Sequence, residues 1–563
     1  MPNPLKQSPP PVGPPRPGTT VPRALEELAE AVPAARITGP ADAAKALVTG
    51  FTHDSRAVRP GDLYAAMPGA AVHGAQFAPQ AAQAGAAAIL ADESGAERAA
   101  ATGLPVLLVP EVRPALGPIA ARVYGEPASA LLMLGVTGTN GKTTTTYLID
   151  GGLRAAGLRT GLIGTVETRI ADRVVKSVRT TPEAPDLQAL LAVMREDGVG
   201  AVAMEVSSHA LAYGRTAGIR YRVAAFTNLT QDHLDFHADF EDYFETKAKL
   251  FTPEYTGFAV LNADDAHGRR LIERVAAIGL PHWTFSAEGA PGADWRALDV
   301  RLGPDGTRFT LVGPDGARRE AEVALPGEFN VENAVAAVAC LVAAGIDPDT
   351  AIAGVASVPG VPGRMQRVDA GQPYLAVVDY AHTPDAIETL LSAVRPVTSG
   401  TLRIVVGCGG DRDRGKRPLM GAAAARGADE VILTNDNPRS EDPLVILDAA
   451  AAGAREAVAA GAHATVAVVP DRSEAIALAV SASRRGDAVV VAGKGHEQGQ
   501  EIGGVVYPFD DAAVLREAIW ACAPSGSWGT VSETGTVSEK GTVSRTGADS
   551  ESGSASGSGS AAP

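Results

Sequence analysis

Hydrophobic residues along this chain gather in short runs, and most of these runs end in a polar or glycine-rich loop. Longer Ala-rich segments lie between the runs. Short apolar runs bounded by turn residues are typical of buried strands, and the Ala-rich segments are typical of helices. The alternation predicts parallel, doubly wound sheets whose functional sites lie at the carboxyl ends of the strands.

Three blocks of this alternation predict an α/β protein of three domains. The first block contains the runs AGAAAILADE and LPVLLVP. The second begins with ALLMLGV and continues with VGAVAMEV, RVAAFTNL and GFAVLN, and the third extends from YLAVVDY to AVVVAGKG. We expect domains over residues 23–129, 130–360 and 361–521. A Pro-rich tail over residues 1–22 and a Ser/Gly/Thr-rich tail over residues 522–563 flank them, and their composition predicts disorder.

Composition limits the classes of function. The chain has 563 residues, 45% of them hydrophobic, and a formal net charge of −16. This charge argues against a general nucleic-acid or anionic-membrane surface, and no apolar run reaches the roughly 18 residues of a membrane helix. Three cysteines without a CxxC pair argue against zinc. Since the Pro-rich start also lacks the apolar core of a signal peptide, we expect a cytoplasmic protein that binds neither nucleic acid nor membrane.

A glycine-rich turn, within GVTGTNGKTTTT, follows the predicted strand ALLMLGV. It departs from the P-loop pattern because Val136 stands at the first glycine position. Backbone N–H groups at such a turn and helix start still bind phosphate, and a lysine there reaches the outer phosphates. We therefore predict an ATP site, with an ordinary glycine turn as the alternative. The predicted nucleotide contacts are Gly138, Thr139, Asn140, Gly141, Lys142, Thr143 and Thr144.

The segment TGTNGKTT resembles the phosphate loop of the Mur ligases and their folylpolyglutamate-synthase relatives, and the resemblance extends over about residues 45–515. It implies a small N-terminal α/β domain for a UDP-sugar, a central parallel-sheet domain of the P-loop ATPase type, and a C-terminal Rossmann-like domain for an amino acid. It also implies that ATP phosphorylates a carboxylate, and that an amine then attacks the acyl phosphate to give an amide, ADP and phosphate. We expect a monomer.

The resemblance further implies Mg²⁺ beside the phosphates. Moving a phosphoryl group between anions requires positive charge over the transferring oxygens, which Lys142 and two Mg²⁺ ions would supply. Thr143, Glu205 in AMEVSSHAL and His233 in NLTQDHLDFH would be metal ligands. A lone histidine is more often structural, so that alternative stays open for His233.

Lys247 in DYFETKAKLF matches the lysine that Mur ligases carry as a carbamate formed with CO₂. Carbamylation would turn a cation into an anionic oxygen ligand for Mg²⁺. The alternative is a solvated helix lysine, since Lys249 lies two residues on. The resemblance also implies that Asn330, Arg364 and Asp379 contact ATP, although an Asn at a helix start is ordinary capping too.

The implied substrate of the first two domains is UDP-MurNAc-L-Ala-D-Glu. The segment HDSRAVRPGDLYAAMPG resembles the part of the family that binds UDP, and residues 70–72 would flank the uracil. An arginine in the central domain would hold a carboxylate or phosphate with a two-pronged contact. The implied contacts are Ser55, Thr180, Thr181, Ser207 and Arg215.

The third domain implies diaminopimelate as the amino acid. TNDNPRSEDP resembles the segment of the Mur ligases that add it, and the guanidinium of Arg439 could pair bidentately with the far carboxylate, which lysine lacks. Glu497 in GKGHEQG would pair with the far ammonium. The implied contacts are Arg412, Asp436, Asn437, Pro438, Arg439, Gly493 and Glu497.

Two other functions stay open at this point. One is a ligase of the same chemistry with another acceptor, such as lysine or a folate polyglutamate; DNPR and HDSR argue against both. The other is a switch protein that binds nucleotide to change partners, which a third domain with its own ligand loops fits poorly. Turnover that depends on a small amino acid distinguishes the ligase from the switch.

Overall fold

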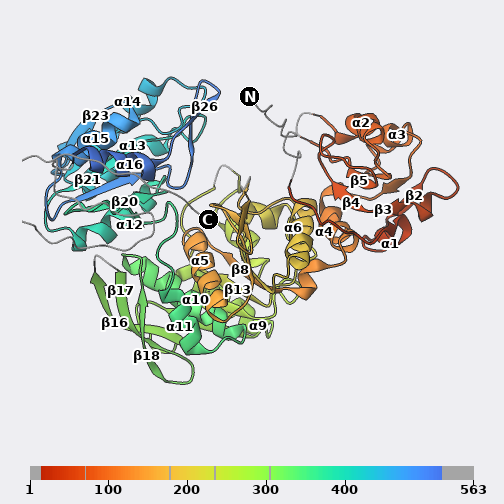
Figure 1. The fold of residues 1–563 in the computed structure, drawn as a ribbon, viewed down its shortest axis with the longest axis horizontal. Coiled ribbons are helices and arrows are strands. Elements are labelled where there is room, and N and C mark those ends of the chain that lie inside the picture. Colours follow the sequence, from red (N-terminus) through yellow and green to blue (C-terminus); the bar gives the residue numbers. More distant parts are fainter. Residues whose placement is uncertain (1–13, 70–71, 176–178, 234–235, 304–305, 523–563) are drawn as a thin grey trace, which may run out of the picture.

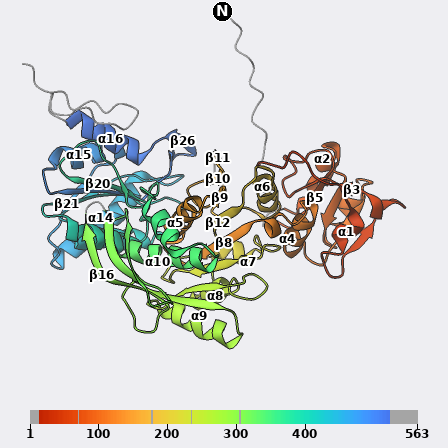
Figure 2. The same cartoon turned by 60° about the horizontal axis from the view of Figure 1, so that its bottom comes forward.

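The structure is a computed structural model that describes residues 14–69, 72–175, 179–233, 236–303 and 306–522. Three sheets with their helices lie in a row, and Figure 1 shows the central one between an N-terminal part on the right and a C-terminal part on the left. Figure 2 keeps this order after a turn of 60°. The central domain therefore contacts both of its neighbours.

The N-terminal domain is a small α/β domain. Its strands are β1 (Arg23–Ala24), β2 (Arg36–Thr38), β3 (Leu47–Val48), β4 (Gly50–Thr52), β5 (Asp62–Ala65), β6 (Ala88–Ala91) and β7 (Val106–Leu108). Its helices are α1 (Leu25–Ala29), α2 (Ala78–Gln83), α3 (Ala96–Ala100) and α4 (Val112–Val123). The main sheet has the order β2-β7-β6-β5-β4, with β2 antiparallel to β7 and the other pairs parallel.

The central domain is built on an eleven-stranded sheet. Its strands are β8 (Leu132–Thr137), β9 (Thr160–Ile163), β10 (Thr168–Ile170), β11 (Arg173–Val175), β12 (Ala201–Glu205), β13 (Val223–Phe226), β14 (Ala259–Asn262), β15 (His282–Ser286), β16 (Trp295–Gly303), β17 (Gly306–Val312) and β18 (Arg318–Val323). Its helices are α5 (Lys142–Ala155), α6 (Ala184–Glu196), α7 (Ser208–Ala212), α8 (Phe240–Ala248), α9 (Ala266–Ala277), α10 (Glu328–Ala343) and α11 (Pro348–Ala356). One apolar core joins α5, α10 and α11 to one face, and a second joins α6, α8 and α9 to the other.

The central sheet is mixed, whereas the apolar runs predicted parallel strands alone. Strands β9, β12, β8, β13, β14, β15 and β16 are parallel neighbours. The antiparallel strands β10 and β11 extend one edge, and β17 and β18 extend the other. The sequence pattern missed these extensions because strands such as β18, RREAEV, bury only alternate residues and form no apolar run.

The C-terminal domain has the doubly wound, Rossmann-like form. Its strands are β19 (Gln366–Arg367), β20 (Leu375–Asp379), β21 (Leu402–Val406), β22 (Glu430–Leu433), β23 (Thr465–Val468), β24 (Ala488–Ala492), β25 (Gly499–Ile502) and β26 (Val505–Pro508). Its helices are α12 (Pro384–Val394), α13 (Lys416–Gly427), α14 (Pro443–Ala459), α15 (Arg472–Ala482) and α16 (Asp511–Cys522). The sheet order is β19-β20-β24-β21-β22-β23, and β25 pairs with β26 in a separate hairpin.

Residues 14–22 correct the prediction that the Pro-rich tail is disordered as far as residue 22. Arg16 forms an ion pair with Asp62 at 2.7 Å, and the backbone N–H groups of Gly18 and Thr19 donate to the carboxylate of Glu196. The composition gave no hint of these contacts, because two charged partners far along the chain hold the segment. Residues 1–13 and 523–563, the rest of the predicted tails, lie outside the described residues.

Within the described ranges, no helix combines the length and the apolar character that crossing a membrane requires.

Candidate active site

The glycine-rich turn joins β8 to α5 and packs against two other segments. Gly138 and Gly141 have positive φ values of 151° and 84°. A Cβ atom at Gly138 would lie 1.9 Å from the Thr227 hydroxyl oxygen, and one at Gly141 would lie 2.3 Å from the side-chain oxygen of Asn333. Both positions therefore require glycine. Val136 is buried within β8, so the departure from the P-loop pattern lies in the strand rather than in the turn.

Lys142 and Lys247 meet at one carbonyl oxygen of this turn. The Nζ atoms of Lys142 and Lys247 lie 2.9 and 2.7 Å from the carbonyl oxygen of Gly138. Burial lowers the pKa of both amines, and the charge of Lys142 lowers the pKa of Lys247 further. Two amines this close repel each other when both are charged. This repulsion favours either a bound anion between them or a neutral Lys247, and both states suit a phosphate site.

The environment of α8 distinguishes the two candidate lysines. Lys247 is 1% exposed, and its ammonium lies 4.6 Å from the ring centroid of Tyr243. Lys249 is exposed. The solvated-lysine alternative therefore describes Lys249 and does not describe Lys247.

Glu205 ends β12 on the same side of the sheet as the phosphate turn. Its carboxylate accepts hydrogen bonds from the Thr165 backbone N–H at 2.7 Å and from the Thr165 hydroxyl at 3.0 Å. The hydroxyl of Thr180 lies 2.9 Å from that of Thr165. Because the charge of Glu205 raises the pKa of Lys142, the two side chains share one electrostatic environment. The predicted metal ligand and the predicted substrate loop are thus neighbours.

Three more predicted substrate contacts adjoin Glu205. The Thr181 hydroxyl donates to the carbonyl oxygen of Glu205 at 2.9 Å and accepts the backbone N–H of Ser207 at 3.2 Å. Arg215 donates to the carbonyl oxygen of Thr181 at 3.3 Å and pairs with Glu183 at 2.9 Å. Burial lowers the pKa of Arg215, an effect that Glu183 opposes. The arginine is thus held in place beside the loop, with its planar group directed by a carboxylate.

His233 follows β13 in a left-handed conformation, with φ of 55°. This conformation costs free energy for a residue other than glycine, and it is common at functional sites. Burial lowers the pKa of His233 to about 4, and the charges of Lys142 and Lys247 contribute while Asp232 opposes them. The imidazole is therefore neutral at neutral pH and presents a lone pair suited to a metal ion.

The donor set around the turn suits Mg²⁺ only when other oxygens join it. Among the described residues, no group of three or more His, Cys, Asp or Glu side chains gathers as a metal site. Glu205 and His233 would need the Thr143 hydroxyl, a carbamate oxygen on Lys247 and phosphate oxygens to complete a shell. Such an oxygen-rich set fits the preference of Mg²⁺.

Asn330 lies beneath the turn rather than on its open side. It is 1% exposed, its amide donates to the carbonyl oxygen of Pro326 at 2.7 Å, and its oxygen accepts from the Asn333 amide at 3.1 Å. Asn333 in turn accepts from the Thr145 hydroxyl at 3.1 Å. This arrangement suits support of the turn by Asn330, and its direct contact with nucleotide stays a prediction.

Arg364 extends from the linker before β19 to the phosphate turn. Its Nη2 lies 3.5 Å from the Thr143 hydroxyl, and its guanidinium carbon lies 4.7 Å from the ring centroid of Tyr380. Asp379, at the end of β20, accepts the backbone N–H of Met365 at 2.7 Å. Burial raises the pKa of Asp379, and the charge of Arg364 opposes this effect. Arg364 is thus placed to reach a nucleotide, while Asp379 fixes the segment that carries it.

A buried polar cluster lies at the carboxyl ends of β22 and β24. The Asn437 amide donates to Glu497 at 2.8 Å, and its oxygen accepts from the Lys494 ammonium at 3.0 Å. Lys494 also lies 3.1 Å from Glu497 and 3.7 Å from Asp436. Burial raises the pKa of Asp436, an effect that Arg472 and Lys494 oppose. Carboxylates, an amide and an ammonium are thus fixed side by side, as a zwitterionic ligand requires.

Arg439 borders this cluster with a left-handed backbone, at φ of 54°. Its guanidinium donates to the carbonyl oxygen of Gly410 at 2.7 Å and lies 3.5 Å from the carboxylate of Glu501. Arg412 is exposed on the facing loop. The structure brings together the seven residues predicted for the amino acid, which are Arg412, Asp436, Asn437, Pro438, Arg439, Gly493 and Glu497.

The predicted sugar-nucleotide contacts of the N-terminal domain lie apart from the phosphate turn. The Ser55 hydroxyl donates to Gln80 at 3.2 Å, and the exposed Arg56 pairs with Asp54 at 2.8 Å. They belong to the domain on the far side of the central sheet from the C-terminal domain (Figure 1). The residues predicted to flank the uracil include 70–71, which lie outside the described residues.

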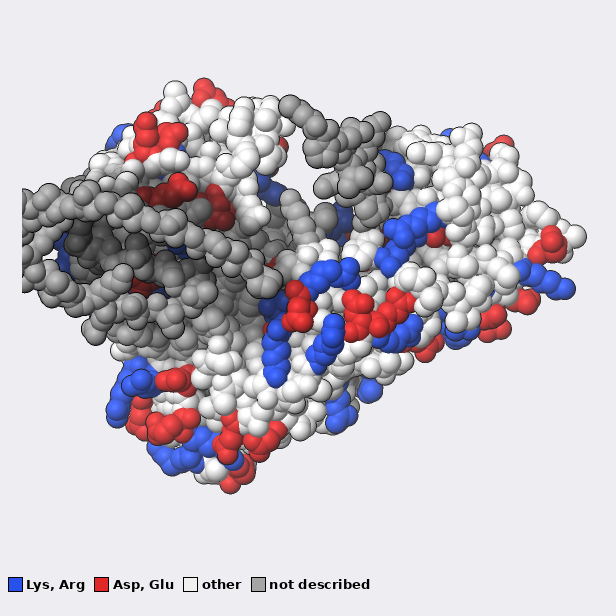
Figure 3. All heavy atoms as spheres, viewed as in Figure 1, with Lys and Arg blue, Asp and Glu red and all other residues white. Residues whose placement is uncertain are grey.

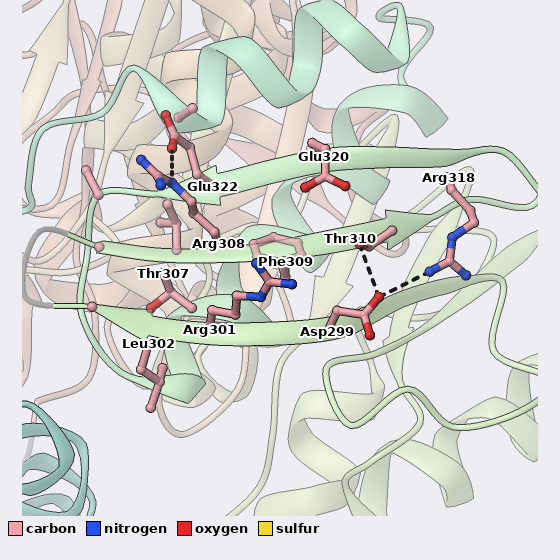
Figure 4. Close-up of a pocket in the computed structure, with 15 residues that line it drawn as sticks. Asp299, Arg301, Leu302, Thr307, Arg308, Phe309, Thr310, Arg318, Glu320 and Glu322 are labelled. Atoms are coloured by element: carbon pink, nitrogen blue, oxygen red, sulfur yellow. Dashed lines mark hydrogen bonds and ion pairs between the residues drawn. The ribbon is translucent and has the colours of Figure 1, made fainter.

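A cavity of about 820 Å³ opens on the antiparallel strands β16, β17 and β18. Figure 4 shows Arg301, Arg308 and Glu322 around it, with the Arg308–Glu322 ion pair marked. None of its lining residues is a predicted site residue. This face carries exposed ion pairs rather than converging ligands. We therefore expect the chemistry at the phosphate turn and not at this cavity.

The surface in Figure 3 intersperses acidic and basic side chains over the central domain. Broad fields of one sign attract nucleic acid or anionic membranes, and alternating charges do not. The cations that matter for anion binding are the buried or half-buried ones, Lys142, Lys247 and Arg364.

Sequence reasoning missed two residues of the C-terminal cluster, Lys494 and His496. Both lie in GKGHEQG, between predicted Gly493 and Glu497, and directly after the apolar run AVVVA. The sequence did offer a signal for Lys494, because this lysine follows an apolar run and lies near the acidic Glu497. Lys494 is 0% exposed and has two hydrogen-bond acceptors, so it is part of the cluster rather than a solvated charge.

Three family models match the chain. The Mur ligase family catalytic domain matches residues 47–124, the Mur ligase middle domain matches 136–341, and the Mur ligase glutamate ligase domain matches 363–495. The chain belongs to the Mur ligase family, which the resemblance at the phosphate turn predicted.

Curated relatives agree with this assignment over nearly their whole length. The chain is 60% identical over 507 residues to the UDP-N-acetylmuramoyl-L-alanyl-D-glutamate–2,6-diaminopimelate ligase of Streptomyces avermitilis, with 90% of this chain and 98% of the relative covered. It is 58% identical to the protein of the same name from Streptomyces coelicolor, with the same coverage.

Solved structures share the three-domain fold. A structure of UDP-N-acetylmuramoyl-L-alanyl-D-glutamate–2,6-diaminopimelate ligase matches with a TM-score of 0.64 and 35% identity, over 89% of this chain and 99% of that chain. A MurF structure from Acinetobacter baumannii matches with a TM-score of 0.61 and 20% identity, over 84% and 96% of the two chains. The second likeness concerns the fold alone.

Proposed function

We propose that this chain joins 2,6-diaminopimelate to the D-Glu side-chain carboxylate of UDP-MurNAc-L-Ala-D-Glu, at the expense of ATP. The chain is an ATP-dependent ligase of the Mur family, and the relatives named above act on these substrates. One observation carries the proposal. The buried polar cluster predicted to bind the amino acid, which Arg439 borders, lies next to the phosphate turn, and Arg364 reaches that turn. One chain supplies every predicted contact, which supports a monomer, and the nucleotide-linked substrates support a cytoplasmic location.

The residues of the turn suit activation of a carboxylate by ATP. The backbone of the turn and the start of α5 would hold the phosphates, and Lys142 would place positive charge over the transferring oxygens. Bound Mg²⁺ would neutralise further charge as the phosphoryl group moves. Thr143, Glu205, His233 and a carbamate on Lys247 are the proposed ligands. Burial and the charge of Lys142 lower the pKa of the Lys247 amine, which favours the neutral form that reacts with CO₂.

The substrate carboxylate is proposed to lie between the turn and the loop of Thr180 and Thr181. Arg215, oriented by Glu183, would hold an anionic group of the muramoyl dipeptide. The bonds from Thr165 to Glu205 keep that loop next to the proposed metal ligand. The carboxylate and the outer phosphate would then face each other with little freedom, which favours the phosphoryl transfer.

Diaminopimelate is favoured over lysine because of charge at the far end of the molecule. Arg439 offers a guanidinium for the far carboxylate, and Glu497 and Asp436 offer anions for the ammonium. Lysine has no far carboxylate for the half-buried guanidinium of Arg439, so it forgoes a charge-assisted contact that diaminopimelate can make.

A phosphate-release assay with a panel of amino acids tests this function. We expect release that requires both the sugar dipeptide and diaminopimelate, and release at least tenfold slower with lysine at equal concentration. Equal rates with lysine would contradict the specificity. Release that ignores both the sugar dipeptide and the amino acid would contradict the ligase and favour a nucleotide-dependent switch.

A further inference from the structure

His496 lies between the amino-acid cluster and the central domain, and no step above uses it. It precedes Glu497 in the chain, and its ring lies 5.3 Å from the ring of Tyr380, centroid to centroid. The backbone of Thr165, the residue that holds Glu205, is close enough to the imidazole to raise its pKa. The ring therefore lies where the C-terminal domain meets the central domain. Thr165 contacts Thr180 of the loop proposed to carry the substrate carboxylate.

Amide formation needs a proton acceptor at this place. The incoming amine arrives as an ammonium ion at neutral pH, and an ammonium nitrogen has no electron pair with which to attack. A charged lysine or arginine side chain can only donate protons, and the Lys247 amine is proposed to be taken up by the carbamate. The acceptor must be an acid or an imidazole within reach of the amino-acid cluster.

The nearby acids already have partners, and Asp436 lies 3.7 Å from the Lys494 ammonium. Glu497 accepts from the Asn437 amide and from the Lys494 ammonium, at 2.8 and 3.1 Å. Asp379 accepts two backbone N–H groups, at 2.7 and 2.8 Å. Nδ1 of His496, by contrast, is a buried nitrogen without a hydrogen-bond partner among the described residues. A buried polar atom left without a partner is costly, and a substrate that supplies the partner removes that cost.

We propose that Nδ1 of His496 accepts a proton from the reacting ammonium group of diaminopimelate, which is not the far ammonium assigned to Glu497. The group loses this proton when its nitrogen attacks the acyl phosphate. This inference rests on the proposed ligase function. The freed electron pair forms the new N–C bond, and the C–O bond to the phosphoryl group breaks with its electrons on phosphate. The second proton of the nitrogen leaves with the phosphate, and His496 later returns its own proton to solvent.

The surroundings of the ring tune it for this step. Burial lowers the pKa of His496 to about 4, and the charge of Arg364 adds to this effect, while Glu497 and the Thr165 backbone oppose it. Tyr380 adjoins the ring and stays protonated, because burial raises its pKa. The imidazole is therefore neutral before the substrates bind. The anionic acyl phosphate and dipeptide then raise its affinity for a proton, since nearby anions favour an imidazolium.

A variant separates proton transfer from carboxylate activation. With His496→Gln, we expect diaminopimelate-dependent amide formation at neutral pH to fall about 10²- to 10³-fold, in line with the usual contribution of a general base. Trapping of the acyl phosphate by hydroxylamine, a nucleophile that is largely unprotonated at neutral pH, should stay within about twofold of wild type. The control is His463→Gln, at an exposed position after α14, which should change neither rate.

The pH dependence distinguishes a base from a structural link between domains. In His496→Gln the loss should shrink as pH rises, because free diaminopimelate then carries an unprotonated amine and needs no acceptor. A loss that stays constant with pH, or an equal loss of hydroxylamine trapping, would overturn the proposal and assign a structural role. Should His496→Gln unfold, the pH profile of kcat for His496→Asn supplies the same comparison. An inactive wild-type enzyme would contradict the ligase function instead.

Discussion

Lys247 and Lys249 are identical in chemistry and differ in what surrounds them. Lys247 packs under the phosphate turn against Tyr243, and Lys249 faces solvent. At the scale of single residues, the resemblance in sequence singled out the lysine of α8 that the structure buries, and its carbamylation stays a prediction. It could not reveal that Lys142 shares a carbonyl oxygen with Lys247, since the two residues lie 105 positions apart and only the fold joins them.

Replacing Lys247 tests the carbamate. Lys247→Ala should lower ligase activity about 10²- to 10³-fold, the usual cost of losing one electrostatic element of an active site. Lys249→Ala should retain wild-type activity, and added formate or acetate should partly restore Lys247→Ala. As pH falls through the lowered pKa of Lys247, the amine takes a proton and can no longer bind CO₂, so activity should also fall there. Absence of rescue and of any response to CO₂ depletion would leave Lys247 as a plain ammonium.

Arg439 is the residue on which amino-acid choice depends. Arg439→Ala should reduce kcat/KM for diaminopimelate about 30-fold, because a hydrogen bond to a charged group contributes roughly 1.5–3 kcal/mol. The Kd of ATP should not change, since Arg439 lies on the C-terminal loops. Arg426→Ala, an exposed arginine of α13 paired with Glu388, is the matched control. Unchanged preference for diaminopimelate over lysine in Arg439→Ala would contradict the assigned role.

At the scale of elements, apolar runs predicted many of the buried strands, although the buried strands β5 and β9 were missed. ALLMLGV, VGAVAMEV, RVAAFTNL and GFAVLN became β8, β12, β13 and β14. The edge strand β18 was missed because exposed polar residues alternate along it, and β17 was missed because polar residues interrupt its apolar ones. The order of residues 14–22 was not predicted, for another reason. It comes from ion pairs and hydrogen bonds to distant residues, and composition carries no information about such contacts.

The residues of this segment link two domains. Arg16 donates to Asp62 of β5 and to the carbonyl oxygen of Ala57, and the side chains of Arg16 and Asp62 are 8% and 2% exposed. Three residues on, the Thr19 hydroxyl donates to Glu196 at the end of α6, at 2.7 Å. The segment therefore ties the N-terminal sheet to the central domain.

Removing the cation from this ion pair should destabilise the N-terminal domain. Arg16→Met leaves Asp62 buried without its charge partner, a change that costs about 3 kcal/mol. Arg36→Met, which removes an ion pair with Glu93 exposed on both sides, should cost less than about 1 kcal/mol. Urea unfolding of both variants measures the difference. Equal free energies of unfolding would show that the segment contributes nothing to the fold.

At the scale of the whole molecule, the site exists only because separate domains meet. Arg364 reaches Thr143, and Lys416 of α13 lies 3.6 Å from Asp232, the neighbour of His233. The sequence predicted ligands on loops that follow apolar runs, and those residue assignments stay predictions. It could not predict which loops touch across domains, because those contacts depend on how three separately packed cores are oriented.

The fate of oxygen in the substrate carboxylate tests the central claim, that this site activates a carboxylate through an acyl phosphate. The D-Glu side chain of UDP-MurNAc-L-Ala-D-Glu is labelled with ¹⁸O, and the phosphate released in the presence of ATP and diaminopimelate is analysed by mass spectrometry. The account predicts one ¹⁸O atom in each phosphate released, together with one amide bond. Phosphate without ¹⁸O would contradict it, because phosphate would then come from hydrolysis of ATP by water and not from an activated carboxylate.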